Sequence, residues 1–346
     1  MTQHFLLTAQ ARSMSLRQIF SLTDDAAFDY FRKSRWGNGE EVTCPCCGSI
    51  ACHYFIKTRK QWRCRDCKHT FSVTSGTLFA FHKLPLKVYL GAVAIYTNAV
   101  KGMSALQLSR DLAVQYKTAF VLAHKIRESL MVKRDESELG GEVEMDGAYV
   151  NGHVRPANKK ADRVDRRLAE NQNPDKRCVF VMRSRADADL GSAARQGDAA
   201  RQGRTLTFIM KQENQAAVKK LAGRFVRKGT VVYADEANAY DPLHAYYDTR
   251  RVNHQIEYRS DAGATNNQAE SFFSRFRRMQ YGQTHKFGNL YLDHYANEAA
   301  YREDNRRMSN GEMFGDIVVK CAGSGTSRDF CGYWQGNRRL AERLVS

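Results

Sequence analysis

The sequence predicts an α/β domain preceded by two smaller modules, a zinc ribbon and a helix-turn-helix. Three patterns carry this prediction. Two Cys-x2-Cys pairs lie in the first quarter of the chain, and two helical stretches separated by a short break follow them. The remaining chain alternates short apolar runs with helical patterns, which is typical of a sheet covered by helices. At 346 residues, the chain has the length of two or three domains.

The charge of the chain predicts an anionic partner. The formal net charge is +17, and lysine and arginine bind phosphates with release of counterions. The first residues lack the basic start and apolar block of an export signal. The longest apolar candidate, 88–100, is shorter than the roughly 20 residues needed to span a bilayer. We therefore expect a core helix there and a cytoplasmic location.

The cysteine pairs predict a zinc ribbon over residues 41–82. Two Cys-x2-Cys knuckles fit one tetrahedral zinc ion, because each knuckle can turn two thiolates towards the same metal. The predicted ligands are Cys44, Cys47, Cys64 and Cys67. Less favoured substitutes are Cys46, Cys52, His53 and His69. Four thiolates leave no position for water, so this zinc is expected to stabilise the module rather than to catalyse.

The predicted ribbon also offers a candidate DNA-binding surface. Its basic side chains, among them Arg63 and Lys68, alternate with aromatic ones such as Trp62. A basic surface that is merely solvated is the alternative. Ahead of the ribbon, the N-terminal segment 1–40 contains one predicted helix, 24–34, with an aromatic face, and we assign it no function.

A helix-turn-helix is predicted within residues 83–134. Two helical patterns, 104–112 and 116–130, are separated by a break at Ala113 and Val114, and Ser104 opens the first with what resembles a capping box. The second helix of such a motif enters the major groove of DNA. Candidate contacts on it are Gln115, Tyr116, Lys117, Thr118 and His124. An ordinary helical hairpin is the alternative, because no glycine marks the turn.

Two carboxylates are predicted at the ends of secondary-structure elements. The apolar run 231–234 indicates a short buried strand that ends at Asp235. Residues 267–279 have apolar side chains at spacings of three and four, which predicts an amphipathic helix with Asn267 as its N-cap. Glu270 lies in the first turn of that helix. Converging carboxylates in a basic protein suggest a hard-metal site that acts on phosphate.

A third acid completes this predicted site. The short strand 143–146 ends in Asp146, and Glu144, two residues earlier, is the fallback. After a boundary at 135–141, the remaining predictions are strands at 178–182, 205–210 and 252–254 and helices at 214–227 and 291–307. Residues 153–177 are rich in lysine and arginine, which predicts a mobile basic hairpin or loop. Contact of this loop with DNA and a merely solvated loop are equally favoured. Residues 311–346 are poorly patterned and are treated as a C-terminal tail.

Four segments together resemble one known family. They are the Cys-Pro-x-Cys-Gly knuckle at 44–48 and the stretches 71–79, 106–112 and 267–275. The chain is similar to insertion-sequence transposases of the IS1595 (ISXO2-like) family over roughly residues 25–311. The resemblance implies an RNase H-like catalytic domain at 141–310 and a bacterial, nucleoid-associated enzyme.

The resemblance also implies site residues. Carried over by position, the DDE triad is Asp146, Asp235 and Glu270, and the basic residue beyond the glutamate is Arg277. Some relatives use asparagine as the third ligand, so Asn267 is an alternative to Glu270. The family commonly has Asp-Glu-Thr at the first acid, whereas Gly147 follows Asp146 here.

The implied reaction is metal-assisted cleavage and strand transfer on double-stranded DNA. Three carboxylates can hold two Mg²⁺ ions, one to activate water or a 3′-hydroxyl and one to stabilise the leaving oxygen. Arg277 lies about two helical turns after Glu270 and is a candidate for phosphate contact. We expect a homo-oligomer on DNA. The alternatives are an inactive, domesticated transposase that acts as a zinc-dependent DNA-binding regulator, and a nuclease that cuts without joining.

Overall fold

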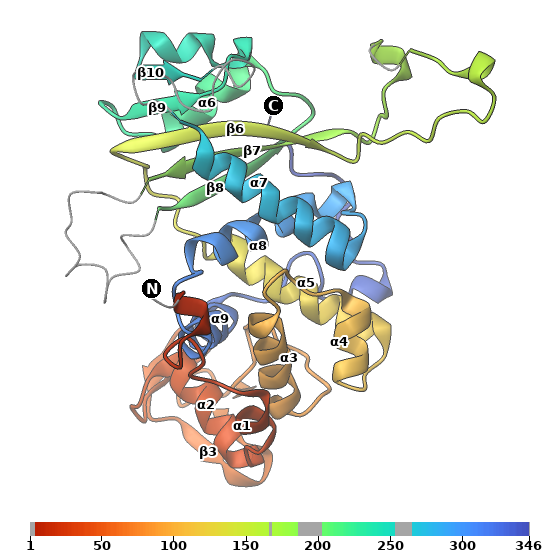
Figure 1. Cartoon of the computed structure of the whole chain (residues 1–346). Coiled ribbons are helices and arrows are strands. Elements are labelled where there is room, and N and C mark those ends of the chain that lie inside the picture. Colours follow the sequence, from red (N-terminus) through yellow and green to blue (C-terminus); the bar gives the residue numbers. More distant parts are fainter. Residues whose placement is uncertain (1–3, 166–167, 186–202, 253–264, 346) are drawn as a thin grey trace. The chain divides into compact units, whose positions relative to one another are not determined.

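The computed structural model describes residues 4–165, 168–185, 203–252 and 265–345, and it divides the chain into two compact units (Figure 1). The first unit spans Met1–Arg134 and Arg307–Arg339. The second spans Asp135–Arg306 and Leu340–Ser346. Within the described residues, no helix is both long and apolar enough to cross a membrane.

The first unit begins with two helices and a small antiparallel ribbon. The helices are α1, Leu16–Phe20, and α2, Asp24–Trp36. A two-stranded sheet pairs β1, Val42–Thr43, with β2, Ile50–Ala51. A three-stranded sheet follows in the order β3, Tyr54–Ile56, β4, Gln61–Arg63, and β5, Thr70–Ser72. Such short strands bury little surface by themselves, so the ribbon needs other contacts to be stable.

Helix α2 supplies part of the core of the ribbon. The Phe28 ring stacks on Trp62 of β4 at a centroid distance of 5.6 Å, and Trp36 meets the same indole edge-on at 5.2 Å. Phe71 of β5 stacks on Trp62 from the ribbon side at 5.9 Å. Phe28 and Trp36 of the predicted aromatic face thus pack on the ribbon, whereas Tyr30 packs on Phe314.

Four further helices complete the first unit. They are α3, Leu86–Asn98, α4, Ala105–Asp111, α5, Tyr116–Val132, and α9, Asn310–Gly323. The turn between α4 and α5 has no glycine, and Ala113 adopts the left-handed conformation there with φ of 52°. Ser104 caps α4, because its Oγ accepts from the Gln107 N–H at 3.1 Å.

Helix α9 lies in the segment treated as a tail from sequence. Ser309 and Glu312 form a reciprocal capping box at its start, and Phe314, Ile317 and Cys321 are buried. The helix packs against α2, α3 and α5. Residues 311–323 therefore belong to the core of the first unit, because their apolar side chains recur at helical spacing.

The second unit is built on a five-stranded mixed sheet in the order β10-β9-β6-β7-β8. Its strands are β6, Glu142–Val150, β7, Arg177–Ser184, β8, Thr205–Met210, β9, Val231–Ala234, and β10, Asp248–Arg251. The first three pair antiparallel, whereas β9 is parallel to both β6 and β10. The last strand precedes its predicted position: Val252 follows it, and residues 253 and 254 lie outside the described part of the chain.

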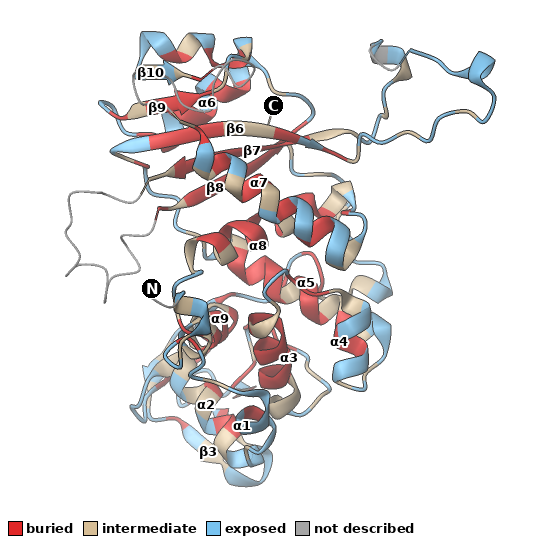
Figure 2. Ribbon diagram, viewed as in Figure 1, coloured by how far each residue is buried: buried red, intermediate tan, exposed pale blue. Residues whose placement is uncertain are grey.

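Helices cover both faces of this sheet (Figure 2). On one face, α6, Gln215–Phe225, packs with the 3-10 segment η7, Asn238–Ala245. On the other lie α7, Asn267–Met279, and α8, Leu292–Asp304. Side chains alternate along β6, so Val143 and Met145 face α6 whereas Ala148 and Val150 face α7.

Shorter turns connect these elements. The 3-10 turns are η1, Phe5–Leu7, η2, Lys57–Arg59, η3, Lys160–Asp162, η4, Ala169–Asn171, η9, Asn289–Tyr291, and η10, Tyr333–Gln335, and a π-turn, η8, spans Gln280–Thr284. Turns η3 and η4 belong to the connection between β6 and β7, which extends away from the sheet (Figure 1). This connection contains most of the basic segment predicted as a loop, and residues 166 and 167 lie outside the description.

Candidate metal centres

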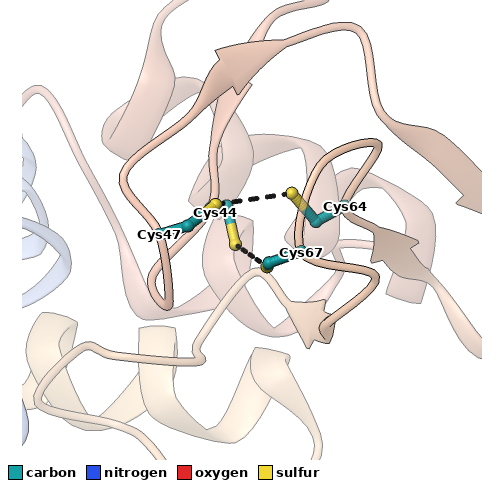
Figure 3. Close-up of side chains that lie close together, drawn as sticks. All are labelled: Cys44, Cys47, Cys64 and Cys67. Carbon is teal, nitrogen blue, oxygen red and sulfur yellow. Dashed lines mark hydrogen bonds between the residues drawn. The ribbon is translucent and has the colours of Figure 1, made fainter.

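The first candidate centre is formed by the four predicted zinc ligands. Their sulfur atoms all lie within 4.8 Å of one another, and they point towards a common centre from two facing loops (Figure 3). The Cys44 and Cys67 sulfurs are 3.7 Å apart, and those of Cys47 and Cys64 are 3.6 Å apart. A tetrahedron with Zn–S bonds of about 2.3 Å has edges of about 3.8 Å. The cluster therefore fits zinc.

The two loops have the same local construction. Gly48 follows Cys47 with φ of 76°, and Lys68 follows Cys67 with φ of 62°, so each loop turns back after its second cysteine. A backbone N–H donor from His69 lowers the pKa of Cys67, but burial and the neighbouring thiols outweigh it and raise that pKa to about 12. Burial raises the pKa of Cys64, but the N–H donors of Cys67 and Asp66 and hydrogen bonds with the Cys47 and Cys67 thiols together bring it to about 6. These donors favour the thiolate that zinc requires.

The substitutes considered for the cysteine ligands lie elsewhere. Cys46 and Cys52 are exposed free thiols. His53 is buried against the edge of the Phe71 ring, and its Nδ1 accepts from the Arg65 N–H at 3.3 Å. His69 is exposed and is not part of the sulfur cluster.

The second candidate centre lies where β9 ends beside the middle of β6. Asp146 is two residues beyond Glu144 in β6, Asp235 is two residues beyond Tyr233 in β9, and Glu144 and Tyr233 are paired. The two aspartates therefore lie at the same level where these parallel strands diverge. Burial and the charge of Asp235 raise the pKa of Asp146 to about 7.

Glu270 approaches the aspartates from the first turn of α7. Its side chain is exposed, and its charge adds to the rise in the pKa of Asp146. Asn266 rather than Asn267 is the N-cap of α7, and Asn267 is exposed at the first helical position. Among the residues that the structure describes, the four cysteines are the group of three or more metal donors within 4.8 Å of one another. The acids are thus neighbours without a closed ligand set.

A fourth acid, Glu213, was not predicted. It follows β8, its pKa is raised first by burial, and Asp235 adds to this rise. The Tyr240 hydroxyl donates to Oε1 of Glu213, and the Glu213 N–H donates to the Tyr149 hydroxyl at 3.2 Å. An acid soon after the apolar run 205–210 repeats the pattern that identified Asp235, so the sequence did contain a signal.

Gly147 makes room for this fourth acid. A Cβ on Gly147 would lie 2.7 Å from Oε2 and 2.8 Å from Oε1 of Glu213. The Glu213 carboxylate therefore occupies the space that any side chain after Asp146 would need. This contact gives a physical role to the glycine at the position where the resemblance leads one to expect glutamate.

Glu144 has a different environment from the one expected of a fallback ligand. It is fully buried, and its two carboxylate oxygens accept hydrogen bonds from the start of α7 and from Arg185. Alternation in β6 places it on the same face as Asp146, but α7 covers it. Its oxygens are already bonded within the protein.

The lysine and arginine side chains predicted to contact DNA are exposed, whereas His124, a further candidate, is buried. Arg277 is exposed on α7. Arg63 and Lys68 line one surface pocket of the ribbon. Lys117 is exposed at the start of α5, with its ammonium 5.1 Å from the centre of the Trp334 ring. His124 is instead buried and stacked on Phe330, which excludes it as a groove contact.

Comparisons with known proteins match the two parts of the chain that contain the candidate centres. The ISXO2-like transposase domain of the IS1595 type matches residues 138–304, and the transposase zinc-ribbon domain matches residues 22–70. The second match begins before α2, in agreement with the packing of that helix on the ribbon. A protein of Halobacterium salinarum, described as an uncharacterized protein in transposable element ISH50, is 27% identical over 228 residues. The alignment covers 64% of this chain and 70% of that protein.

Proposed function

This chain belongs to the IS1595 (ISXO2-like) transposase family, and from this premise we propose that it cleaves DNA at insertion-sequence ends and joins the freed ends to a target. One observation carries the proposal. Asp146 lies within β6 and Asp235 directly follows the adjacent parallel strand β9, and burial together with the charges of Asp235 and Glu270 raises the pKa of Asp146. A concentration of negative charge in a basic protein supports binding of divalent cations that act on phosphate.

The sheet topology supports an RNase H-like assignment for the second unit. Its first strand, β6, is central and carries the first acid, and the parallel neighbour β9 leads into the second acid. Helix α7 crosses one face and carries the third acid. All three acids thus come from elements whose positions depend on the same sheet.

The proposed chemistry follows from the oxygen donors. Asp146, Asp235 and Glu270 would hold Mg²⁺, which prefers carboxylate ligands. Bound Mg²⁺ would lower the pKa of the attacking hydroxyl and stabilise the leaving oxygen. The exposed Arg277, on the helix of Glu270, would orient a DNA phosphate. The zinc ribbon and the α4–α5 pair would bind DNA through Arg63, Lys68 and Lys117, with zinc acting only as a structural ion.

A cleavage assay with the zinc-loaded full chain and DNA that carries the ends of its own element tests this proposal. We expect Mg²⁺-dependent release of a 3′ end and, with pre-cut ends, joining to a target. Asp235→Ala should abolish cleavage and retain DNA binding. Glu236→Ala, at the next and exposed position, is the matched control and should cleave normally.

Three results would contradict parts of the proposal. Binding without cleavage by the wild-type chain would favour the DNA-binding regulator. Cleavage without joining of pre-cut ends would favour a nuclease. Full cleavage by Asp235→Ala would remove the assignment of the acids.

A further inference from the structure

A buried carboxylate of β6 caps the helix that carries Glu270. Glu144 is fully buried, and its Oε2 accepts from the N–H groups of Gln268 at 2.8 Å and Ala269 at 2.9 Å. The side chain of the N-cap residue, Asn266, caps neither of these groups. A negative charge at a helix N-terminus satisfies unpaired N–H donors and interacts favourably with the helix dipole. The strand therefore supplies the cap of α7.

Arg185, one residue after β7, completes this contact. Its Nε donates to Glu144 Oε1 at 2.8 Å, and its Nη2 donates to the Thr265 carbonyl at 2.7 Å, just before α7. Its guanidinium lies 3.9 Å from the centre of the Tyr233 ring in β9. A fully buried carboxylate requires such a partner, because an uncompensated charge inside a protein is strongly destabilising.

These contacts reach each element just before its acid. Glu144 is two residues before Asp146, and Tyr233 is two residues before Asp235. The capped N–H groups belong to the residues two and one before Glu270. The ion pair of the buried Glu144 with the half-buried Arg185 thus touches all three elements within two residues of the three acids.

Two neighbouring contacts hold the same turn of α7. The Asn266 Nδ2 donates to the Met145 carbonyl at 3.2 Å, in the residue before Asp146. The Arg183 Nε donates to the Gln268 Oε1 at 3.1 Å. The first turn of α7 is therefore bonded to both β6 and β7, and a rotation or slip of the helix would break several hydrogen bonds at once.

We propose that Glu144 and Arg185 form a clamp that sets the distance of Glu270 from Asp146 and Asp235, and that Glu144 is thus a positioning residue for the metal site. The inference rests on the proposed function of the three acids. A displacement of about 1 Å can cost about 10²-fold in rate when reacting groups must be held in place. Glu144 therefore acts through α7 and has no contact with the reacting atoms.

The test compares two conservative substitutions in the zinc-loaded full chain. Glu144→Gln removes the charge of the clamp at constant size. Glu342→Gln is the matched control, because Glu342 makes a two-bond ion pair with Arg177 of β7 at 2.6 and 2.7 Å in the same unit. Each substitution removes one partly or fully buried ion pair, but only Glu144 contacts α7.

The first readout is amide hydrogen exchange, which needs no activity. In Glu144→Gln, we expect faster exchange in the peptide 265–279 and unchanged protection in β8, residues 205–210. Glu342→Gln should leave the peptide 265–279 protected. Unchanged exchange of α7 in Glu144→Gln overturns the clamp, and equal acceleration in β8 shows general destabilisation and overturns it as well.

The second readout connects the clamp to the acids. Glu144→Gln should weaken Mn²⁺ binding, lower single-turnover cleavage by about 10²-fold and leave the Kd for DNA unchanged. Normal cleavage by Glu144→Gln beside an active wild-type chain overturns the positioning role alone. A wild-type chain that neither binds Mn²⁺ nor cleaves overturns the proposed function instead, while the exchange experiment still decides whether the clamp exists.

Discussion

The two candidate metal centres are assembled in opposite ways. The cysteine centre takes all its ligands from two short loops, and each loop turns through a residue with positive φ directly after its second cysteine. The acidic centre would take its ligands from β6, from the residue after β9 and from α7, and the ion pair of the buried Glu144 with the half-buried Arg185 contacts all three elements. Local turns are sufficient to bring the sulfurs together, whereas only the completed fold can bring the carboxylates together.

The two centres also differ in the pKa values of their candidate ligands. Hydrogen bonds bring the pKa of Cys64 to about 6 against the effect of burial, whereas burial and the neighbouring thiols raise the pKa of Cys67 to about 12, so the four thiols do not all ionise without a metal. Burial and neighbouring acids raise the pKa of Asp146, so the acidic centre resists full ionisation without a cation. We therefore expect zinc to be part of the folded state and Mg²⁺ to bind a site that has already folded.

Loss of the zinc site should have the largest effect. Replacing Cys64 and Cys67 with serine removes two of the four ligands and should remove about one zinc per chain. The effect on stability should be large, because structural zinc contributes about 10–16 kcal/mol in small zinc modules. The ribbon should unfold, and the second unit should remain folded. Elemental analysis and near-ultraviolet circular dichroism of the tryptophans measure this. Cys46→Ser is the control, and a well-folded wild-type ribbon without zinc would contradict the assignment.

The third acid gives the next largest effect. Glu270→Ala should lower single-turnover cleavage by about 10³-fold or more, as expected for a group that acts as part of a catalytic unit. Asn267→Ala should remain within a few-fold of wild type. The reverse ranking of the two variants would assign the third ligand to Asn267, so the second centre would no longer consist of three carboxylates.

The pH dependence of the metal-free acidic centre should be smaller but diagnostic. Asp146 has a folded pKa of about 7, above the ordinary aspartate value of about 3.9. The folded state therefore holds the proton more tightly, and stability should fall as pH rises from about 4 to about 7. Asp146→Asn should raise the Tm at pH 8 and change it little near pH 4.5. An equal change at both pH values would exclude ionisation of Asp146 as the cause.

The smallest effect is expected at the contact between Gly147 and Glu213. Gly147→Ala should destabilise the chain by about 1 kcal/mol, because the added methyl group must displace the Glu213 carboxylate. Chemical denaturation of both single variants and the double variant with Glu213→Ala measures the coupling. The double variant should lose less stability than the sum of the singles. Additive losses would show that the two residues do not compete for space.

Short-range patterns predicted much of this molecule. The order of strands and helices from β6 to α7 follows the apolar periodicity, with β10 a few residues earlier than expected. The α4–α5 pair forms without a glycine, because Ala113 adopts the required positive φ. Helix α9 was missed although its capping box and apolar spacing were present.

The predicted end of a strand at Asp146 was wrong, because apolar side chains resume at Ala148 and Val150 and β6 continues to Val150. The sequence by itself determined the cysteine cluster, the position of Asp235 directly after its strand and the position of Glu270 in the first turn of its helix. These features depend on neighbours within a few residues, and spacing reports such neighbours directly. Only the tertiary structure decided that His124 is buried, that Glu213 fills the space beside Gly147, and that Glu144 caps α7. Each of these joins residues far apart in the chain, and their contacts depend on how the strands and helices pack.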